Sequence, residues 1–195
     1  AKAIQAEGFS ETVFADNLNC FRLFDGSTGD EHIFAHLNRC QSSLHDWGAA
    51  NQVAFDPGKE SFHILHPRKH WGNNFHMLGV TFDPQLIMHT ACYEIAAMAS
   101  VRLHALLRTK RFHSTATLVR QYKSQILSFI DFATPAVYHS PQFFLQVVDR
   151  IQEDFLEQVS LTPQKALLEH SLAPLSTRRD ISMLGLLHRV STGTA

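Results

Sequence analysis

Asp16 is the residue whose type and setting most clearly suit chemistry, because it stands between two apolar stretches with Asn17 directly after it. Asp and Asn tolerate turn conformations, so this pattern predicts two short strands within roughly residues 10–24, joined by a two-residue turn at Asp16 and Asn17. A carboxylate at such a turn is exposed on a rigid support, which suits a hard cation. Ordinary turn chemistry explains the same two residues, and both interpretations stay open.

Lys59 and Gly79 are two further residues that could have a functional role, judged by their neighbours in the sequence. Lys59 follows the turn-forming sequence Asp56-Pro57-Gly58, where an exposed lysine is the usual outcome. Gly79 interrupts a stretch of alternating apolar and polar residues. An isolated glycine within a strand indicates either a bulge or a close backbone approach by another molecule. Each residue therefore has a structural explanation beside a functional one.

The elements that must position these residues mix helix and strand as far as residue 88. Residues 1–9 are rich in alanine and predict a short helix. From Asp30, as N-cap, apolar residues recur at spacings of three and four up to Gly48, which predicts an amphipathic helix. Three stretches are predicted as short strands: residues 52–55, 61–65 and 75–82, the last interrupted at Gly79.

From residue 89 onward the apolar spacing is helical. A first helix is predicted across residues 92–107. Three further helices are predicted: residues 114–132, interrupted at Thr134-Pro135, residues 141–159, and a segment starting at Thr162-Pro163. The sequence therefore predicts an α+β fold, in which antiparallel hairpins and one helix precede an all-α region.

Charge is divided unevenly along the chain, although the net charge is only −1. Residues 1–60 sum to −5, residues 61–130 to +6 and residues 131–195 to −2. No Asp or Glu lies between Ile95 and Ile130, where six basic residues fall: Arg102, Arg108, Lys110, Arg111, Arg120 and Lys123. An acidic part followed by a basic part suits a metal site beside a polyanion, and it equally suits two ordinary solvated faces.

Composition excludes several classes of protein. Hydrophobic residues make up 45% and charged residues 18% of the chain, which is typical of a globular protein and not of a disordered one. There is no run of about 18 apolar residues, so no ordinary transmembrane helix is expected. Three widely separated cysteines without a Cys-x-x-Cys spacing support neither a zinc ribbon nor a disulfide framework, which favours a reducing compartment. The N-terminus lacks the apolar core of a signal peptide and an initiator Met, so the chain is expected to be part of a longer protein.

Phe14-Ala15-Asp16-Asn17 resembles the Tyr/Phe-Ala-Asp-Asp box of reverse transcriptases, with Asn17 in place of the second acid. The order of features after this box is also similar to that family: a helix, a strand, and a turn with Lys59. Phe75-His76-Met77-Leu78-Gly79-Val80 resembles the strand-turn-strand called the primer grip, and helices like those of the thumb follow. The spacing, together with the closing sequence from Leu172 to Arg179, is most similar to the non-LTR (LINE-type) retrotransposon branch.

The resemblance implies a division of the chain and a set of roles. Residues 1–88 would be the C-terminal half of the palm, residues 89–160 the thumb, and residues 161–195 a helical segment downstream of it. Asp16 would bind Mg²⁺ in the intact parent, with Asn17 beside it, in nucleotide addition by a two-metal mechanism. Lys59 would act near the leaving pyrophosphate.

The resemblance also implies the partners: an RNA template, a DNA primer and deoxynucleoside triphosphates, in an intracellular and nuclear setting without a membrane. Leu78, Gly79 and Val80 would contact the primer end, and the six basic residues from Arg102 to Lys123 would contact phosphates of the duplex. The family's fingers and its other palm carboxylate lie upstream of the hairpin. One carboxylate does not place two metal ions, so this chain alone is expected to be inactive.

A metal-dependent enzyme is the first alternative to a polymerase, because the chain has 13 histidines. His32 and His36, like His66 and His70, have the i, i+4 spacing of metal ligands, but neither pair has the Glu of His-Glu-x-x-His and no Cys cluster adds ligands. Most of the histidines are therefore expected at the surface or at edges. A non-enzymatic alternative is an inactive remnant that acts at most as a non-specific nucleic-acid-binding helical module. Duplex affinity without nucleotide incorporation would separate that alternative from a polymerase.

Overall fold

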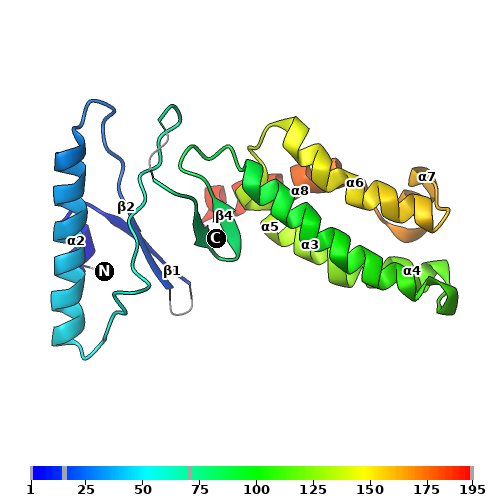
Figure 1. Ribbon diagram of the computed structural model, residues 1–195, viewed down its shortest axis with the longest axis horizontal. Coiled ribbons are helices and arrows are strands. Elements are labelled where there is room, and N and C mark those ends of the chain that lie inside the picture. The colour runs from blue at the N-terminus through cyan, green and yellow to red at the C-terminus, as the bar shows by residue number, and fades with distance from the viewer. Residues whose placement is uncertain (1, 15–16, 70–71, 194–195) are drawn as a thin grey trace. The chain divides into compact units, whose positions relative to one another are not determined.

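The computed structural model describes residues 2–14, 17–69 and 72–193. The fold is α+β and mostly helical, with two small antiparallel hairpins (Figure 1). The chain divides into two compact units, Ala1–Phe62 and His63–Ala195. The boundary between these units lies after Phe62, whereas the predicted division after residue 88 falls within the second unit, just before the helix that starts at His89.

The first unit contains a short helix, a hairpin and a long helix. Its elements are α1 (Lys2–Ala6), β1 (Ser10–Phe14), β2 (Asn17–Phe21) and α2 (Asp30–Ala50). The core is small: Ile4, Phe9 and Cys40 are buried, and Leu18 and Leu37 are among the partly buried side chains around them. The hairpin is therefore held mainly by α1 and by one face of α2.

Residues 51–62 lack regular secondary structure, so the strands predicted at 52–55 and 61–65 are wrong. The chain turns back at the end of α2, where the Val53 N–H donates to the Gly48 carbonyl at 2.8 Å. A Cβ at Gly48 would lie 2.6 Å from the Val53 oxygen, so glycine permits this close approach. A strand needs a neighbouring strand for its backbone groups, and this segment has none among the described residues.

Side chains attach the end of this irregular segment to α2. Gln41 Nε2 donates to a Glu60 carboxylate oxygen at 2.6 Å, and His45 Nε2 lies 2.9 Å from the other oxygen. These hydrogen bonds lower the pKa of Glu60, Gln41 contributing the most. Polar side-chain contacts therefore hold this segment in place of the strand pairing that the sequence pattern predicted.

The second unit contains a hairpin and a set of packed helices. Its elements are β3 (Phe75–Met77), β4 (Val80–Phe82), α3 (His89–Arg108), the 3₁₀ turn η1 (Lys110–Phe112), α4 (Thr115–Tyr122), the π-helical turn η2 (Lys123–Leu127), α5 (Ser128–Val137), α6 (Gln142–Gln158), α7 (Pro163–His170) and α8 (Leu175–Thr192). α4, η2 and α5 follow one another without a break. α3 packs chiefly on α6, and the two helices run side by side in Figure 1.

The core of the second unit centres on two aromatic rings. Tyr122 and Phe155 are fully buried, and their rings stack with centroids 4.2 Å apart and planes 9° from parallel. Apolar side chains from α3, α4, α5 and α6 surround them. The Tyr122 hydroxyl is buried without a hydrogen-bond partner in the described chain, and its burial raises the pKa of the phenol.

The helix predicted at residues 114–132 was expected to be interrupted at Thr134-Pro135. This prediction is wrong, because α5 continues through Pro135 to Val137. Proline inside a helix removes a backbone hydrogen bond and costs about 3 kcal/mol. Ala133, Thr134 and Val137 are all buried on the face that meets the core. Tertiary packing therefore holds the helix together across a residue that would end it in isolation.

Two ion pairs attach α8 to the rest of the second unit. Arg179 is buried and makes a bidentate contact with Asp149 of α6, with N–O distances of 2.5 and 2.9 Å. Arg178 pairs with Asp131 of α5 at 2.5 Å, and both side chains are about one-third exposed. Among the described residues, no helix combines the length and the apolar character needed to cross a membrane.

We expect Arg179→Ala to lower the free energy of unfolding by about 3 kcal/mol, because it leaves the Asp149 carboxylate without its buried partner. Arg178→Ala is the matched control, and its ion pair, with both side chains about one-third exposed, should be worth about 1 kcal/mol or less. Urea unfolding followed by far-UV circular dichroism measures both. Equal losses for the two variants would contradict the assignment of Arg179 as the buried anchor.

Tyr122→Phe should raise the free energy of unfolding by about 1 kcal/mol, since it keeps the stacked ring and removes a buried hydroxyl without a partner. Tyr138→Phe is the control, because the exposed Tyr138 hydroxyl donates to Asp180 at 3.1 Å. That variant should change stability little. A loss of stability in Tyr122→Phe would show that the hydroxyl has a favourable contact.

Candidate functional site

The β1–β2 hairpin differs by one residue from the predicted turn. Phe14 pairs with Asn17 and Val13 with Leu18, so Asn17 opens β2 and is not a turn residue. The prediction of a turn at Asp16 and Asn17 is wrong in this respect, because Asn17 takes part in the antiparallel register. Asp16 itself lies outside the described residues, so its role as a metal ligand stays a prediction.

The described residues offer little to a divalent cation. They contain no group of three or more His, Cys, Asp or Glu side chains able to hold a metal ion. Asn17 contributes a neutral amide where a second carboxylate would be needed. Two-metal catalysis requires carboxylates that hold both ions against the reacting phosphate. The hairpin by itself therefore does not fit a complete two-metal centre.

Lys59 is exposed at the end of a tight turn in the first unit. Its backbone N–H donates to the Asp56 carbonyl at 3.0 Å, and the Gly58 N–H donates to the Asp56 carboxylate at 2.9 Å. Glu60, the next residue, is held against α2 by the side chains described above. The turn is thus fixed on both sides, and the Lys59 side chain extends from it into solvent.

The stretch predicted as one interrupted strand is a hairpin. β3 and β4 pair antiparallel, with Met77 opposite Val80 and a two-residue turn at Leu78 and Gly79. Both turn residues have positive φ angles, 51° and 79°, as the favoured two-residue hairpin turns require. Leu78 is 44% exposed at the tip, whereas Val80 is buried in the core beside α3. Of the three residues predicted to contact a primer, two therefore lie at an accessible turn and one does not.

Thr81 bonds this hairpin to α3, and Asp83 fixes the turn that leads into α3; neither residue was among the predicted site residues. Thr81 Oγ1 donates to Glu94 of α3 at 2.5 Å. The Asp83 carboxylate accepts the backbone N–H groups of Gln85, Ile87 and Met88 at 3.1, 3.0 and 2.6 Å. An Asp followed by Pro just before a helix is a recognisable sequence signal for such a junction. These contacts fix the turn at Leu78 relative to the helical unit.

Three of the six predicted phosphate-binding residues are engaged within the fold. Lys110 Nζ donates to the carbonyl of Gln158, the last residue of α6, and Lys123 Nζ donates to the carbonyl of His170, the last residue of α7. Cations at helix C-termini neutralise unsatisfied carbonyl groups. Arg102 Nη1 donates to the Gln125 carbonyl at 3.0 Å, and its guanidinium lies 4.0 Å from the centroid of the Phe129 ring.

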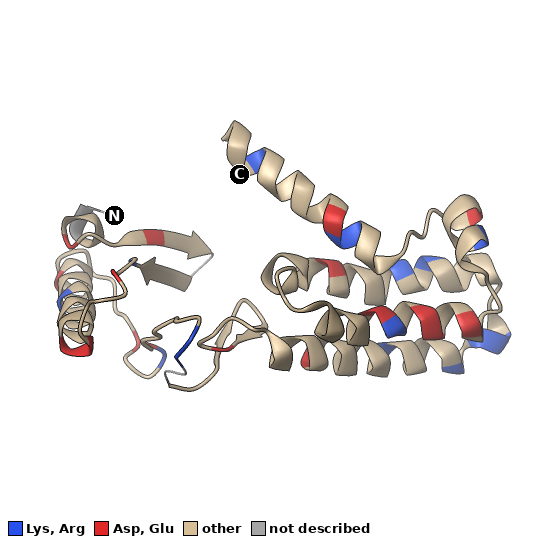
Figure 2. Cartoon of the chain, turned by 90° about the horizontal axis from the view of Figure 1, so that it is seen from above, with Lys and Arg blue, Asp and Glu red and all other residues tan. Residues whose placement is uncertain are grey.

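The other three residues predicted to bind phosphate are exposed: Arg108, Arg111 and Arg120. The Arg111 guanidinium lies 4.6 Å from the centroid of the Phe112 ring. Figure 2 shows that the basic residues of the helical unit are interspersed with acidic ones. The acidic and basic residues are therefore less separated in the folded helices than they are along the sequence.

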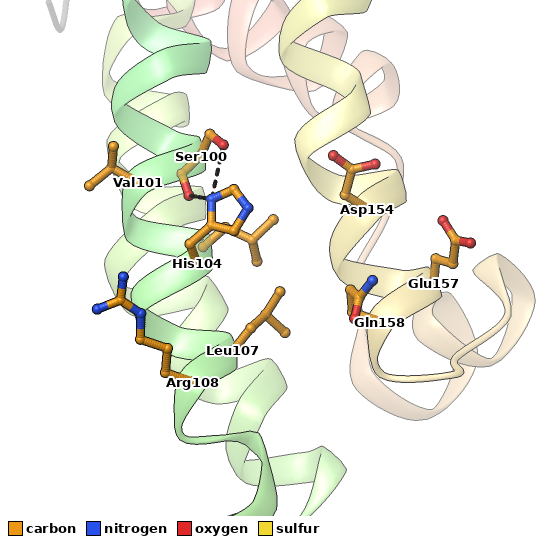
Figure 3. Close-up of a pocket in the computed structure, with 9 residues that line it drawn as sticks. Ser100, Val101, His104, Leu107, Arg108, Asp154, Glu157 and Gln158 are labelled. Carbon is orange, nitrogen blue, oxygen red and sulfur yellow. Dashed lines mark hydrogen bonds between the residues drawn. The ribbon is translucent and has the colours of Figure 1, made fainter.

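A groove of about 740 Å³ lies between α3 and α6. On the α3 side His104 and Leu107 point into it, while the Arg108 guanidinium is directed away from α6 (Figure 3). On the α6 side its lining includes Asp154 and Glu157. Carboxylates of α6 thus flank the stretch of sequence that lacks acids, and a polyanion would meet Arg108 on the outer face and not inside the groove.

Gly79→Ala should destabilise the β3–β4 hairpin by about 1 kcal/mol, because alanine disfavours a φ of +79°. Gly26→Ala is the matched control: it also has open space around its Cα but no positive φ. Hydrogen exchange of the cross-strand amides of Met77 and Val80 measures the local stability. Similar exchange rates in both variants would contradict the turn geometry.

No protein family, no characterised protein and no solved structure matches this chain.

Proposed function

We propose that this chain is part of an RNA-directed DNA polymerase of the non-LTR retrotransposon type, comprising the later part of the palm and the thumb. The observation that carries the proposal is the β3–β4 hairpin, whose turn at Leu78 and Gly79 is accessible and whose strand β4 is bonded to α3 through Thr81 and Glu94. A Lys-bearing turn precedes this hairpin, and a helical unit follows it. In reverse transcriptases of this type, a turn with a lysine, the primer-grip hairpin and the helical thumb follow one another in the same order.

In this proposal the hairpin turn supports the primer end. Gly79 lacks a side chain, so a sugar-phosphate backbone can approach the turn closely. Leu78 offers an exposed apolar surface beside it, and buried Val80 holds the turn on the core. Lys59 supplies a positive charge for the leaving pyrophosphate. The partners are an RNA template, a DNA primer and deoxynucleoside triphosphates, and the setting is nuclear.

Asp16 is the residue that this proposal assigns to Mg²⁺ in the intact parent polymerase. The ion would supply Lewis-acid stabilisation of the reacting phosphate. Because Asn17 replaces an acid and the described residues form no second carboxylate site, we expect the 195-residue chain to extend no primer by itself.

The second candidate function is sequence-independent binding of nucleic acid without catalysis. The exposed side chains of Arg108, Arg111 and Arg120 in the second unit favour it, since arginine forms bidentate contacts with phosphate. Under both candidate functions, three cations are engaged in holding the fold, since each donates to a backbone carbonyl: Arg102, Lys110 and Lys123. Both candidate functions predict duplex binding, and only the polymerase predicts synthesis.

We expect a triple variant, Arg108→Gln with Arg111→Gln and Arg120→Gln, to bind an RNA–DNA duplex about tenfold or more weakly than the unchanged chain. The slope of log affinity against log salt should become shallower by about 0.9 for each phosphate that the variant no longer neutralises. Fluorescence anisotropy across a salt series measures both quantities. Arg150→Gln with Lys165→Gln, two exposed cations of α6 and α7, is the control and should change neither much.

An unchanged salt slope in the triple variant, or an equal loss of affinity in the control, would contradict the assigned binding surface. Template-dependent synthesis by the parent polymerase, with Asn17 as found and with Asn17→Asp, separates the two candidates. Synthesis in either form supports the polymerase. Retained duplex binding with no synthesis in both forms supports the binding module. Primer extension by the 195-residue chain alone would overturn the expectation that it is inactive.

A further inference from the structure

Four side chains that can carry positive charge meet on one face of α2 in the first unit. His32, His36 and Arg39 lie at positions i, i+4 and i+7, which places them on the same side of the helix. Arg22 reaches them from the segment just after β2. The Nη1 atom of Arg22 and the Nη2 atom of Arg39 each lie 3.0 Å from His36 Nδ1. His36 Nε2 lies 3.1 Å from His32 Nε2.

Arg22 is held in place by contacts apart from this cluster. Its Nη1 atom donates to the Glu7 carbonyl at 2.8 Å, and its guanidinium lies 5.2 Å from the centroid of the Phe24 ring and 5.8 Å from that of Phe9. A Cβ at Gly8 would come within 3.2 Å of the guanidinium, and Gly8 has a φ of +75°. The backbone therefore leaves a space that the guanidinium occupies, and its orientation is set before any ligand arrives.

The two guanidinium groups favour the neutral form of His36. A guanidinium only donates, so a ring nitrogen of His36 has to accept from it, and Arg39 Nη2 lies 3.0 Å from Nδ1 and 3.2 Å from Nε2. A neutral imidazole has one acceptor nitrogen, so the two arginines compete for it. Burial lowers the pKa of His36, and the charges of Arg22, Arg39 and His32 lower it further, while the carboxylate of Glu7 acts in the opposite direction.

The two arginines keep their charge at all ordinary pH values. Among the described residues, neither of them forms an ion pair with a carboxylate. The nearby acid is Glu7, whose carboxylate is within hydrogen-bonding distance of Ser43 at 3.5 Å. Two guanidinium groups that share one neutral imidazole therefore form a cluster of positive charge that the Glu7 carboxylate offsets only in part, without an ion pair to either arginine in the described part of the chain.

We propose that Arg22, Arg39, His32 and His36 form a binding site for an oxyanion of the phosphate type. The anion accepts hydrogen bonds from both guanidinium groups, which then no longer need His36 as acceptor. Its negative charge also favours the protonated form of the imidazoles. The site lies in the first unit and is separate from the phosphate contacts proposed for the second unit, so either assignment can fail without the other.

Protonation and binding are linked, and the sign follows from the depressed pKa. Without an anion, His36 is neutral at and above its ordinary pKa of about 6.5 and resists protonation below it. A bound anion raises the pKa, so binding takes up protons and the affinity increases as the pH falls through this range. Inorganic sulfate is the suitable probe for the pH series, because its charge of −2 stays constant across this pH range, whereas the charge of phosphate changes.

The experiment titrates the 195-residue chain with sodium sulfate at constant ionic strength and follows the ring signals of the histidines by ¹³C–¹H NMR. We expect saturable shifts of His32 and His36, and binding about tenfold tighter near pH 5.5 than near pH 7.5. Arg39→Gln changes an exposed residue and should weaken binding about tenfold, as expected for one charged hydrogen bond. Arg150→Gln, on α6, is the control and should leave the affinity unchanged.

Arg22→Lys is the second variant, because it keeps the charge and loses the two-pronged donor, and circular dichroism checks that it folds. It should bind sulfate more weakly than the unchanged chain. Shifts that do not saturate, the same affinity in Arg39→Gln as in Arg150→Gln, or binding that strengthens as the pH rises would each overturn the proposal. Competition then identifies the source of the anion. Displacement of sulfate by a short single-stranded oligonucleotide at lower concentration than by inorganic phosphate would assign the site to a nucleic-acid backbone, and the reverse order would assign it to a free phosphate group.

Discussion

The stack of Tyr122 on Phe155 is the contact on which the arrangement of the helical unit depends. Tyr122 ends α4 directly before the π-helical turn, and Phe155 lies near the end of α6. A π-helical turn inserts one residue into the helix and shifts its face. Ile126 and Leu127, inside the turn, are both buried. The core therefore continues through the turn into α5, which packs on α3 and α8.

The helices could be predicted from sequence because their apolar spacing reports burial directly. The spacing in residues 92–107 and 141–159 corresponds closely to α3 and α6. Short strands were less predictable, because a strand forms only beside a neighbouring strand, and the sequence pattern of one segment does not show which segment will lie next to it. Residues 52–55 have strand-like composition, but they attach to α2 through the Val53 N–H, which donates to the Gly48 carbonyl. Farther along the same segment, Glu60 is bonded to Gln41 of α2. The residues from Phe75 to Phe82 alone predicted one interrupted strand, whereas the resemblance to the primer grip predicted the strand-turn-strand that is present. Leucine disfavours the positive φ of this turn, and the hairpin pairing imposes it on Leu78.

The candidate site was predicted less completely than the fold. Six cations in an acid-free stretch suggested a single phosphate-binding surface, yet Lys110 and Lys123 are bound to the carbonyl ends of α6 and α7. Sequence alone does not reveal which helix ends lie within reach of a lysine. The same holds for Arg22 and Arg39, which are far apart in the chain and share one histidine ring in the fold. His32 and His36 were considered as metal ligands, but the two guanidinium groups beside them disfavour a cation.

The unequal sizes of the two cores have a consequence for how the chain denatures. The core of the first unit has only three buried apolar residues among those described, Ile4, Phe9 and Cys40, whereas that of the second unit extends across most of its helices. Stability scales with the apolar surface that folding buries, so the two units differ in their resistance to heat. The first unit should melt at a lower temperature, giving a stepwise transition and not a single cooperative one. On heating, α1, α2 and the β1–β2 hairpin should therefore unfold while the helices of the second unit stay folded.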